Sequence, residues 1–128
     1  MKIALVNLCR IQDFSKTKYY ESSLEFLKEN DIEFVDYFSG RETPSDLLKG
    51  FHEALKNKDI ELVWFIQGGS DLIKFLDKID WDLVKQSNKE YLGLSDFTHF
   101  AFKAVALGKI CYYGQGLKQI KDYLPTPE

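Results

Sequence analysis

Blocks of hydrophobic and polar residues follow one another along the chain with spacings that predict strands and helices in turn. The aliphatic run from Lys2 to Asn7 predicts a first strand, and apolar residues at helical spacing from Ser15 to Glu29 predict a helix. The order then repeats, because Ile32 to Phe38 alternates in part as a half-buried strand does, and Thr43 to Leu55 opens with a proline suited to a helix N-terminus.

The middle of the chain holds its most strand-like segment. Glu61 to Ile66 is almost continuously apolar, which predicts a central strand covered on both faces. A Gly-Gly pair at 68–69 ends this strand, and Ser70 and Asp71 supply N-cap chemistry for a following helix. The segment Asp80 to Val84 predicts a further short turn or helix.

The last third of the sequence continues the alternation. Glu90 to Leu94 predicts a short strand, and Phe97 to Leu107 predicts a helix that Gly108 ends. Ile110 to Tyr113 predicts a fifth strand, and Leu117 to Tyr123 a final helix.

Five strand-then-helix units predict an α/β fold, with a parallel sheet between two layers of helices. We expect residues 1–128 to form a single domain, a flavodoxin-like three-layer sandwich with strand order 2-1-3-4-5. Ligands of such sheets bind beyond the carboxyl ends of the strands, so the loops of interest are Leu8 to Asp13, Gln67 to Ser70, and Gly93 to Asp96. FMN is compatible with this fold, but a fold does not determine function and no cofactor is assigned.

Composition and charge narrow the classes of partner. The chain has 128 residues, a net charge of −3 and 45% hydrophobic residues, and its basic residues are interspersed with acidic ones, which argues against nucleic-acid binding. The first apolar run is too short for a signal peptide or a membrane span, so we expect a cytoplasmic protein. Cys9 and Cys111 are then expected to be free thiols, and His52 and His99 lack zinc-site spacing, so no metal is assigned.

The loops offer few groups with catalytic chemistry. Gly68 and Gly69 can bring backbone amides close to an anion, although a tight turn is the commoner role of such a pair, and no dinucleotide or Walker motif is present. Ser95 follows a strand and precedes a helix, as the serine of a nucleophile elbow does, but an ordinary helix N-cap is the alternative. Cys9 is either a reactive thiol in the crevice or a small buried core residue.

A general base for Ser95 is not evident from the sequence. His99 lies four residues after Ser95 on the same helix, where a side chain points back along the helix and is poorly placed to meet the hydroxyl. We expect a capping or packing role for His99 and a surface or interhelical position for His52.

Three segments together resemble a known family. They are IQGGSD at 66–71, FLDKIDW at 75–81 and KEYLGLSDFT at 89–98. In this order they resemble the N-terminal half of the LD-carboxypeptidase and microcin C self-immunity family of serine peptidases, whose patterns are approximately RGGYG, a leucine-rich segment ending in LD, and GYSDIT. The segment from Tyr113 to Gln115 is similar to the HGP segment of that family.

The resemblance implies specific roles. Ser95 would be the nucleophile, the amides of Gly69 and Asp96 would form the oxyanion hole, and Gln67, Gly68, Ser70 and Cys9 would lie near the ligand. The family cleaves an amide next to a free carboxylate, in murein recycling or in immunity to a microcin-type acyl-sulfamoyl nucleotide. The resemblance therefore implies a bacterial protein whose ligand is a small peptide or a nucleotide-peptide.

Departures from the family pattern matter for activity. Gln67 stands in place of the arginine and Ser70 in place of the tyrosine, and the family's glutamate and histidine partners belong to a C-terminal domain that we expect to be absent here. The first hypothesis is therefore a domain that keeps the elbow serine, binds a ligand and is inactive alone. The second is a serine carboxypeptidase completed by a separately encoded C-terminal half or a dimer mate, and the third is a non-catalytic interaction module that forms a homodimer or binds another partner.

Overall fold

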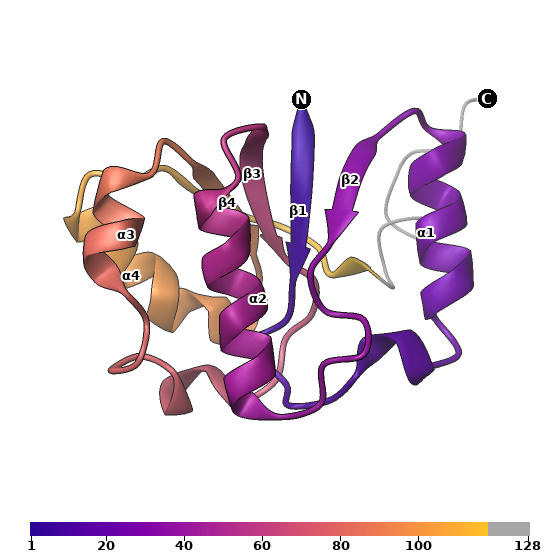
Figure 1. The fold of residues 1–128 in the computed structure, drawn as a ribbon, viewed down its shortest axis with the longest axis horizontal. Coiled ribbons are helices and arrows are strands. Elements are labelled where there is room, and N and C mark those ends of the chain that lie inside the picture. Colours follow the sequence, from indigo (N-terminus) through magenta and orange to yellow (C-terminus); the bar gives the residue numbers. More distant parts are fainter. Residues whose placement is uncertain (118–128) are drawn as a thin grey trace.

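The computed structural model describes residues 1–117 and contains one parallel sheet with strand order β2-β1-β3-β4-β5 (Figure 1). Its strands are β1 (Lys2–Val6), β2 (Glu33–Asp36), β3 (Ile60–Phe65), β4 (Glu90–Gly93) and β5 (Cys111–Tyr113). Its α-helices are α1 (Tyr20–Glu29), α2 (Pro44–Lys56), α3 (Trp81–Gln86) and α4 (Thr98–Ala106), and three short 3-10 helices are η1 (Phe14–Lys16), η2 (Leu72–Lys74) and η3 (Ser95–Phe97). The predicted strand order is confirmed.

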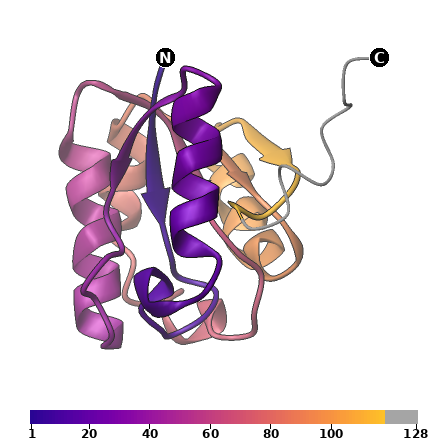
Figure 2. The ribbon, with the colours of Figure 1, turned by 90° about the vertical axis from the view of Figure 1, so that its right-hand side faces the viewer.

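Side chains that alternate along β1 separate the core into two layers. Ala4 and Val6 pack into a cluster with buried residues of α2, α3 and α4, whereas Leu5 packs into a second cluster with Leu27 of α1. Figure 2 shows α2 and α1 on opposite sides of β1. Because successive residues of a strand point to opposite faces, this arrangement confirms the predicted three-layer α/β sandwich.

An aromatic cluster joins α4 to the sheet. Phe100 of α4 is fully buried, and its ring centroid lies 4.9 Å from that of Phe65 on β3 and 4.9 Å from that of Tyr91 on β4. Its ring also stacks on Trp81 of α3 at 5.4 Å. The helix that follows Ser95 is therefore fixed against the two strands whose ends form the candidate site.

The predicted helix from Ser15 to Glu29 is wrong in its first turns. The chain forms η1 there, because the Asp13 carboxylate accepts a hydrogen bond from the Ser15 amide at 3.0 Å and caps this turn. Thr17 is then extended, with φ −86° and ψ 159°, and α1 begins only at Tyr20.

The helix predicted after the Gly-Gly pair is also shorter than expected. Only the single turn η2 forms, and the Asp71 side chain does not cap it. The predicted turn or helix at 80–84 is a helix, α3, whose N-terminal amide at Leu83 donates to the Asp80 carboxylate. The final helix predicted at 117–123 lies, except for Leu117, outside the described residues.

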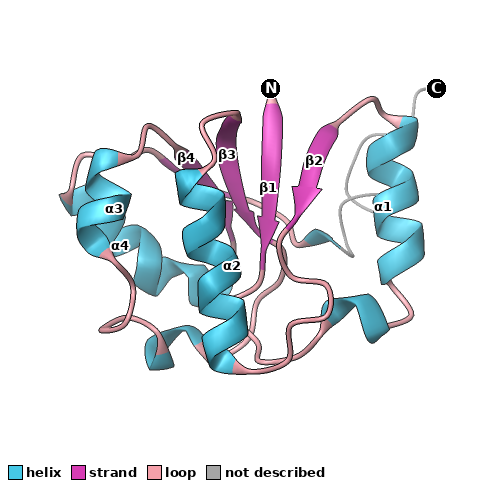
Figure 3. Ribbon diagram, in the orientation of Figure 1, coloured by secondary structure: helices cyan, strands magenta, loops and turns pink. Residues whose placement is uncertain are grey.

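The carboxyl ends of the strands meet at one edge of the sheet. In the view of Figure 3 the arrowheads of β1 and β2 point down, and the loops and short helices that follow β1 and β3 gather below them. Among residues 1–117, no helix combines the length and the apolar character that crossing a bilayer requires.

Replacing Phe100 with alanine should strongly destabilise the domain. The change removes a fully buried aromatic side chain, which typically lowers the free energy of unfolding by about 3–5 kcal/mol. Phe102, two residues along the same helix, is 83% exposed, and Phe102→Ala should change that free energy by less than about 0.5 kcal/mol. Denaturant unfolding of both variants measures the difference, and similar losses would contradict the described packing of α4.

Candidate active site

Ser95 lies at a sharp turn between β4 and α4. Leu94 is still extended, with φ −146° and ψ 161°, whereas Ser95 has φ +52°, in the left-handed region that non-glycine residues rarely adopt. This conformation costs about 1–2 kcal/mol and such strain is concentrated at functional sites. Ser95 is exposed, and its hydroxyl makes no hydrogen bond within residues 1–117.

The N-cap alternative for Ser95 is wrong. The residues that cap η3 and α4 are Leu94 and Phe97, and neither cap uses a side-chain hydrogen bond. The hydroxyl is therefore not engaged in satisfying the start of the helix. A serine with this backbone and this exposure matches the geometry of a nucleophile elbow.

Close packing requires glycine at position 93, and Gly68 of the preceding loop lies beside the turn. A Cβ atom on Gly93 would lie 2.2 Å from Cγ of Phe97, so no other residue fits before the elbow. A Cβ atom on Gly68 would lie 3.4 Å from Cβ of Ser95 and 3.9 Å from its hydroxyl oxygen. The loop after β3 thus lies directly against the Ser95 side chain, as predicted for adjacent strand ends.

The loops after β1 and β3 are also joined. A Cβ atom on Gly69 would lie 2.0 Å from the carbonyl oxygen of Cys9, and the amide of Asp71 donates to that same oxygen at 3.0 Å. The Asp71 carboxylate accepts from the Ile11 amide at 2.8 Å, and this hydrogen bond is the main reason why the pKa of Asp71 lies below its usual value. Asp71, predicted as a helix cap, instead links two loops.

Asp96 ties the elbow to the same loop system. Its buried carboxylate accepts a hydrogen bond from the Leu72 amide at 2.9 Å. Nε2 of His99 lies 3.7 Å from the other Asp96 oxygen, and the His99 side chain is 54% exposed. His99 therefore lies beside the carboxylate of the residue that follows Ser95, and its predicted capping or packing role stays a prediction.

Two backbone amides in the loops of the candidate site make no hydrogen bond to protein within the described chain. They belong to Gly69 and Asp96, the residues predicted to form an oxyanion hole. An oxyanion hole needs N–H donors that are fixed in place before the reaction, and both residues sit in segments held by the contacts described above. Their role toward a ligand stays a prediction.

Gln67 and Cys9 are buried beneath the site. Gln67 is 6% exposed, donates to the Asn7 side chain at 3.1 Å and accepts from Gln12 at 3.3 Å. Cys9 is fully buried, and this burial, reinforced by the Asp96 carboxylate, raises its pKa far above the usual value for a thiol. Both side chains are therefore protein-facing, whereas Ser70, in the same loop as Gly68, is exposed. The reactive-thiol interpretation of Cys9 is wrong.

The side chain of His52 lies between α2 and the start of α3. His52 belongs to α2, its Nε2 accepts a hydrogen bond from the Asp80 amide at 3.0 Å, and its partial burial lowers its pKa. This confirms the predicted interhelical position. Within residues 1–117, no group of three or more His, Cys, Asp and Glu side chains is arranged to hold a metal ion.

Tyr113, which begins the segment similar to the family's HGP segment, makes a contact at this site that the sequence analysis did not predict. Its hydroxyl oxygen accepts a hydrogen bond from the Ser95 amide, with 2.7 Å between nitrogen and oxygen. The register of the sheet places Tyr113 opposite Gly93, at the carboxyl end of β5. The predicted strands could have indicated this contact, because they end near residues 93 and 113 and the ends of parallel strands lie at the same edge of a sheet.

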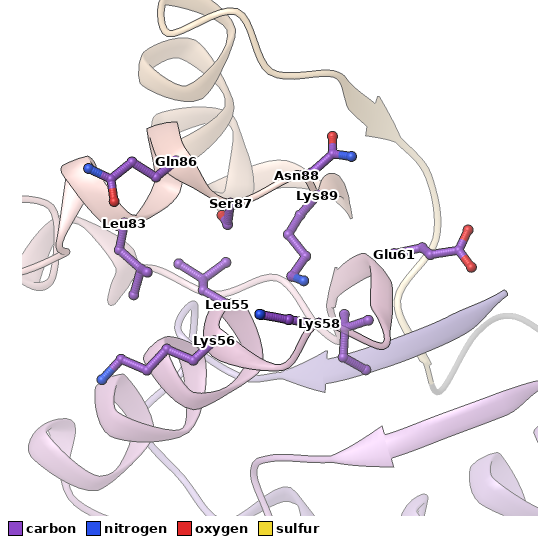
Figure 4. A pocket seen from close by; sticks show the side chains of 10 residues that line it. Leu55, Lys56, Lys58, Glu61, Leu83, Gln86, Ser87, Asn88 and Lys89 are labelled. Carbon is purple, nitrogen blue, oxygen red and sulfur yellow. The ribbon is translucent and has the colours of Figure 1, made fainter.

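A pocket of about 430 Å³ lies at the opposite, amino-terminal edge of the sheet, where α2 and α3 end (Figure 4). Lys89 lines this pocket, is 7% exposed and donates from Nζ to the carbonyl oxygen of Asn57 at 2.7 Å. Lys109 donates similarly to the Ser87 carbonyl. These ammonium groups satisfy carbonyls at helix C-termini, so their arrangement is explained by capping.

The sheet order and the connections define a doubly wound α/β domain, in which a serine with positive φ lies at the carboxyl end of β4. The sequence model of the LD-carboxypeptidase N-terminal domain matches residues 3–114, and the chain belongs to this family. A comparison with curated protein sequences gave no match.

Solved structures share the fold. The muramoyltetrapeptide carboxypeptidase from Oxalobacter formigenes is 21% identical, with a TM-score of 0.78 over 91% of this chain and 40% of that protein. The microcin C7 self-immunity protein MccF, in complex with aspartyl sulfamoyl adenosine, is 22% identical, with a TM-score of 0.82 over 98% of this chain and 40% of that one. An MccF-like protein from Bacillus anthracis is 17% identical, with a TM-score of 0.80 over 92% of this chain and 38% of that protein. The chain thus spans about two fifths of the length of these proteins.

Replacing Ser95 with glycine should stabilise the domain. Glycine adopts positive φ without the steric cost that Ser95 bears, so the free energy of unfolding should rise by about 0.5–1 kcal/mol. Ser22 lies inside α1, and Ser22→Gly should lower that free energy by about 0.5 kcal/mol. Chemical denaturation of the two variants tests the strain, and equal destabilisation by both would show that Ser95 is not strained.

Proposed function

We propose that this chain carries the nucleophile of an LD-carboxypeptidase-type serine peptidase site, with Ser95 Oγ as the attacking atom and the Gly69 and Asp96 amides as the oxyanion hole. The observation that carries the proposal is the turn at Ser95, which combines φ +52°, exposure of the side chain and a position beside Gly68, where an added Cβ atom would lie 3.9 Å from the Ser95 hydroxyl oxygen. Strain of this kind persists only where the surrounding structure enforces it. The match to the LD-carboxypeptidase family supports a catalytic role for the serine at this turn.

The chemistry requires one more group. When Ser95 Oγ attacks an amide carbonyl, its proton must pass to a base, and that base normally contributes about 10²–10⁴-fold to the rate. Within residues 1–117 no side chain accepts a hydrogen bond from the Ser95 hydroxyl. We therefore infer that the domain by itself binds ligand at the carboxyl edge of the sheet but does not hydrolyse it at a useful rate.

The proposed ligand class is supported by the family and by the ligands of its solved relatives. One relative is a muramoyltetrapeptide carboxypeptidase, and others are complexes of MccF with aspartyl sulfamoyl adenosine and glutamyl sulfamoyl guanosine. We propose a small peptide with a free terminal carboxylate, or an aminoacyl-sulfamoyl nucleotide, as the ligand of this chain. Murein recycling or microcin immunity in the cytoplasm would be the corresponding role.

A second candidate function is full peptidase activity, with the glutamate and histidine supplied from outside the described residues. The relevant observation is that the chain spans 38–40% of its solved relatives. The missing groups would come from another segment or from a separate chain, such as a C-terminal half or a homodimer mate. Hydrolysis of an LD-tetrapeptide that stays at background with every such partner added would contradict this candidate.

Labelling with a fluorophosphonate tests the first candidate. Without a base, Ser95 of the purified chain should react no faster than about tenfold above the exposed Ser70 of the adjacent loop, as followed by intact mass and peptide mapping. Ser95→Ala and Ser70→Ala are the matched controls. Rapid stoichiometric labelling that disappears only in Ser95→Ala would show an activated nucleophile, and the claim that the domain is incompetent alone would fail.

A further inference from the structure

Tyr113 is held beside the Ser95 elbow by the pairing of the last two strands. Gly93 and Tyr113 are register partners, and the amide of Gly114 donates to the Gly93 carbonyl at 2.9 Å. Leu92 lies against Gly114 so closely that a Cβ atom there would come within 2.9 Å of the leucine side chain. The backbone at the end of β5 is therefore fixed next to the turn that Ser95 forms.

The hydroxyl of Tyr113 meets a requirement that the strained turn creates. The amide of a residue with positive φ points away from the acceptors that a regular strand or helix would offer. This N–H donor therefore needs another acceptor. The Ser95 amide finds one in the Tyr113 oxygen at 2.7 Å, a short hydrogen bond for an N–H donor. Tyr113 is nevertheless 71% exposed, so burial of its ring does not explain its position.

The neighbouring tyrosine behaves differently. Tyr112 precedes Tyr113 on the same strand, so its side chain points to the opposite face. Its hydroxyl donates to the Glu90 carboxylate at 2.9 Å, and it is 49% exposed. Two adjacent, exposed tyrosines thus make one hydrogen bond each, and only that of Tyr113 reaches the nucleophile position.

We propose that Tyr113 is a positioning residue for the nucleophile, which holds Ser95 in the elbow conformation through the Ser95 amide and so keeps Oγ directed toward the Gly68–Gly69 loop. This inference rests on the proposed function, since it gives Tyr113 a role at the same serine. The phenol does not take part in bond making. Its contribution is to stabilise the backbone conformation with positive φ in which the Ser95 side chain lies beside Gly68.

The test compares Tyr113→Phe with Tyr112→Phe in the full chain. Each change removes one hydroxyl and keeps the ring. In the NMR spectrum of Tyr113→Phe, the Ser95 amide proton should shift upfield and exchange with solvent about fivefold faster or more, the factor that corresponds to one neutral hydrogen bond. Tyr112→Phe should leave this signal unchanged, and the amide signals of the core should be unaffected in both variants.

A second readout follows the reaction of Ser95 itself. During prolonged exposure to a fluorophosphonate, the Oγ–phosphorus bond forms as the phosphorus–fluorine bond breaks, fluoride leaves and the serine proton passes to solvent. The rate should fall about fivefold in Tyr113→Phe and not in Tyr112→Phe. A purely structural role of Tyr113 would change the unfolding midpoint and leave this rate, measured on folded protein, as it is.

The outcomes separate this inference from the proposed function. An unchanged Ser95 amide signal in Tyr113→Phe, or an unchanged labelling rate despite an altered signal, would overturn the role of Tyr113. Fast labelling of the unmodified chain would refute the proposal that the domain alone is inactive. The ratio of the labelling rates of Tyr113→Phe and Tyr112→Phe would still test the role of Tyr113. If the unmodified chain is not labelled at all, the amide signal decides.

Discussion

The close approach of the loop after β3 to the turn after β4 is the constraint on which the site depends. Gly68 lies against Ser95, Gly69 lies against the Cys9 carbonyl, and Gly93 leaves room for the ring of Phe97. A side chain at Gly69 or Gly93 would collide with neighbouring atoms at 2.0 or 2.2 Å. Because backbone approaches backbone here without intervening side chains, amide groups can come within reach of atoms bound at the serine.

Buried or partly buried carboxylates hold this arrangement together. Asp71 accepts the amide of Ile11, and Asp96 accepts that of Leu72, so loops from three strand ends are connected through charge-assisted hydrogen bonds. The aromatic packing of Phe100 fixes the helix that follows the elbow. The serine is thus placed by the sheet, by two carboxylates and by one helix, while its own hydroxyl makes no hydrogen bond within residues 1–117.

Alternating apolar blocks predict a parallel sheet whose carboxyl ends meet at one edge, and this places Ser95 at that edge. The order 2-1-3-4-5 is one of the common orders of such sheets and is not determined by the alternation itself. Interactions between segments that are distant in the sequence could not be predicted in this way. Asp71 has the chemistry of a helix cap but bonds an amide sixty positions away, and the helix expected from Ser15 is broken by the Asp13 cap. Tyr113 depends on strand register and on side-chain direction, which periodicity does not encode.

The most direct test of the central claim is a crystal structure of the chain with ordered water molecules visible. The account predicts positive φ at Ser95, an exposed hydroxyl, and a water bound by both the Gly69 and the Asp96 amides within hydrogen-bond distance of that hydroxyl, about 2.7–3.1 Å from each donor. A Ser95 with negative φ whose hydroxyl caps the following helix, or amides of Gly69 and Asp96 bonded to other protein groups, would contradict it.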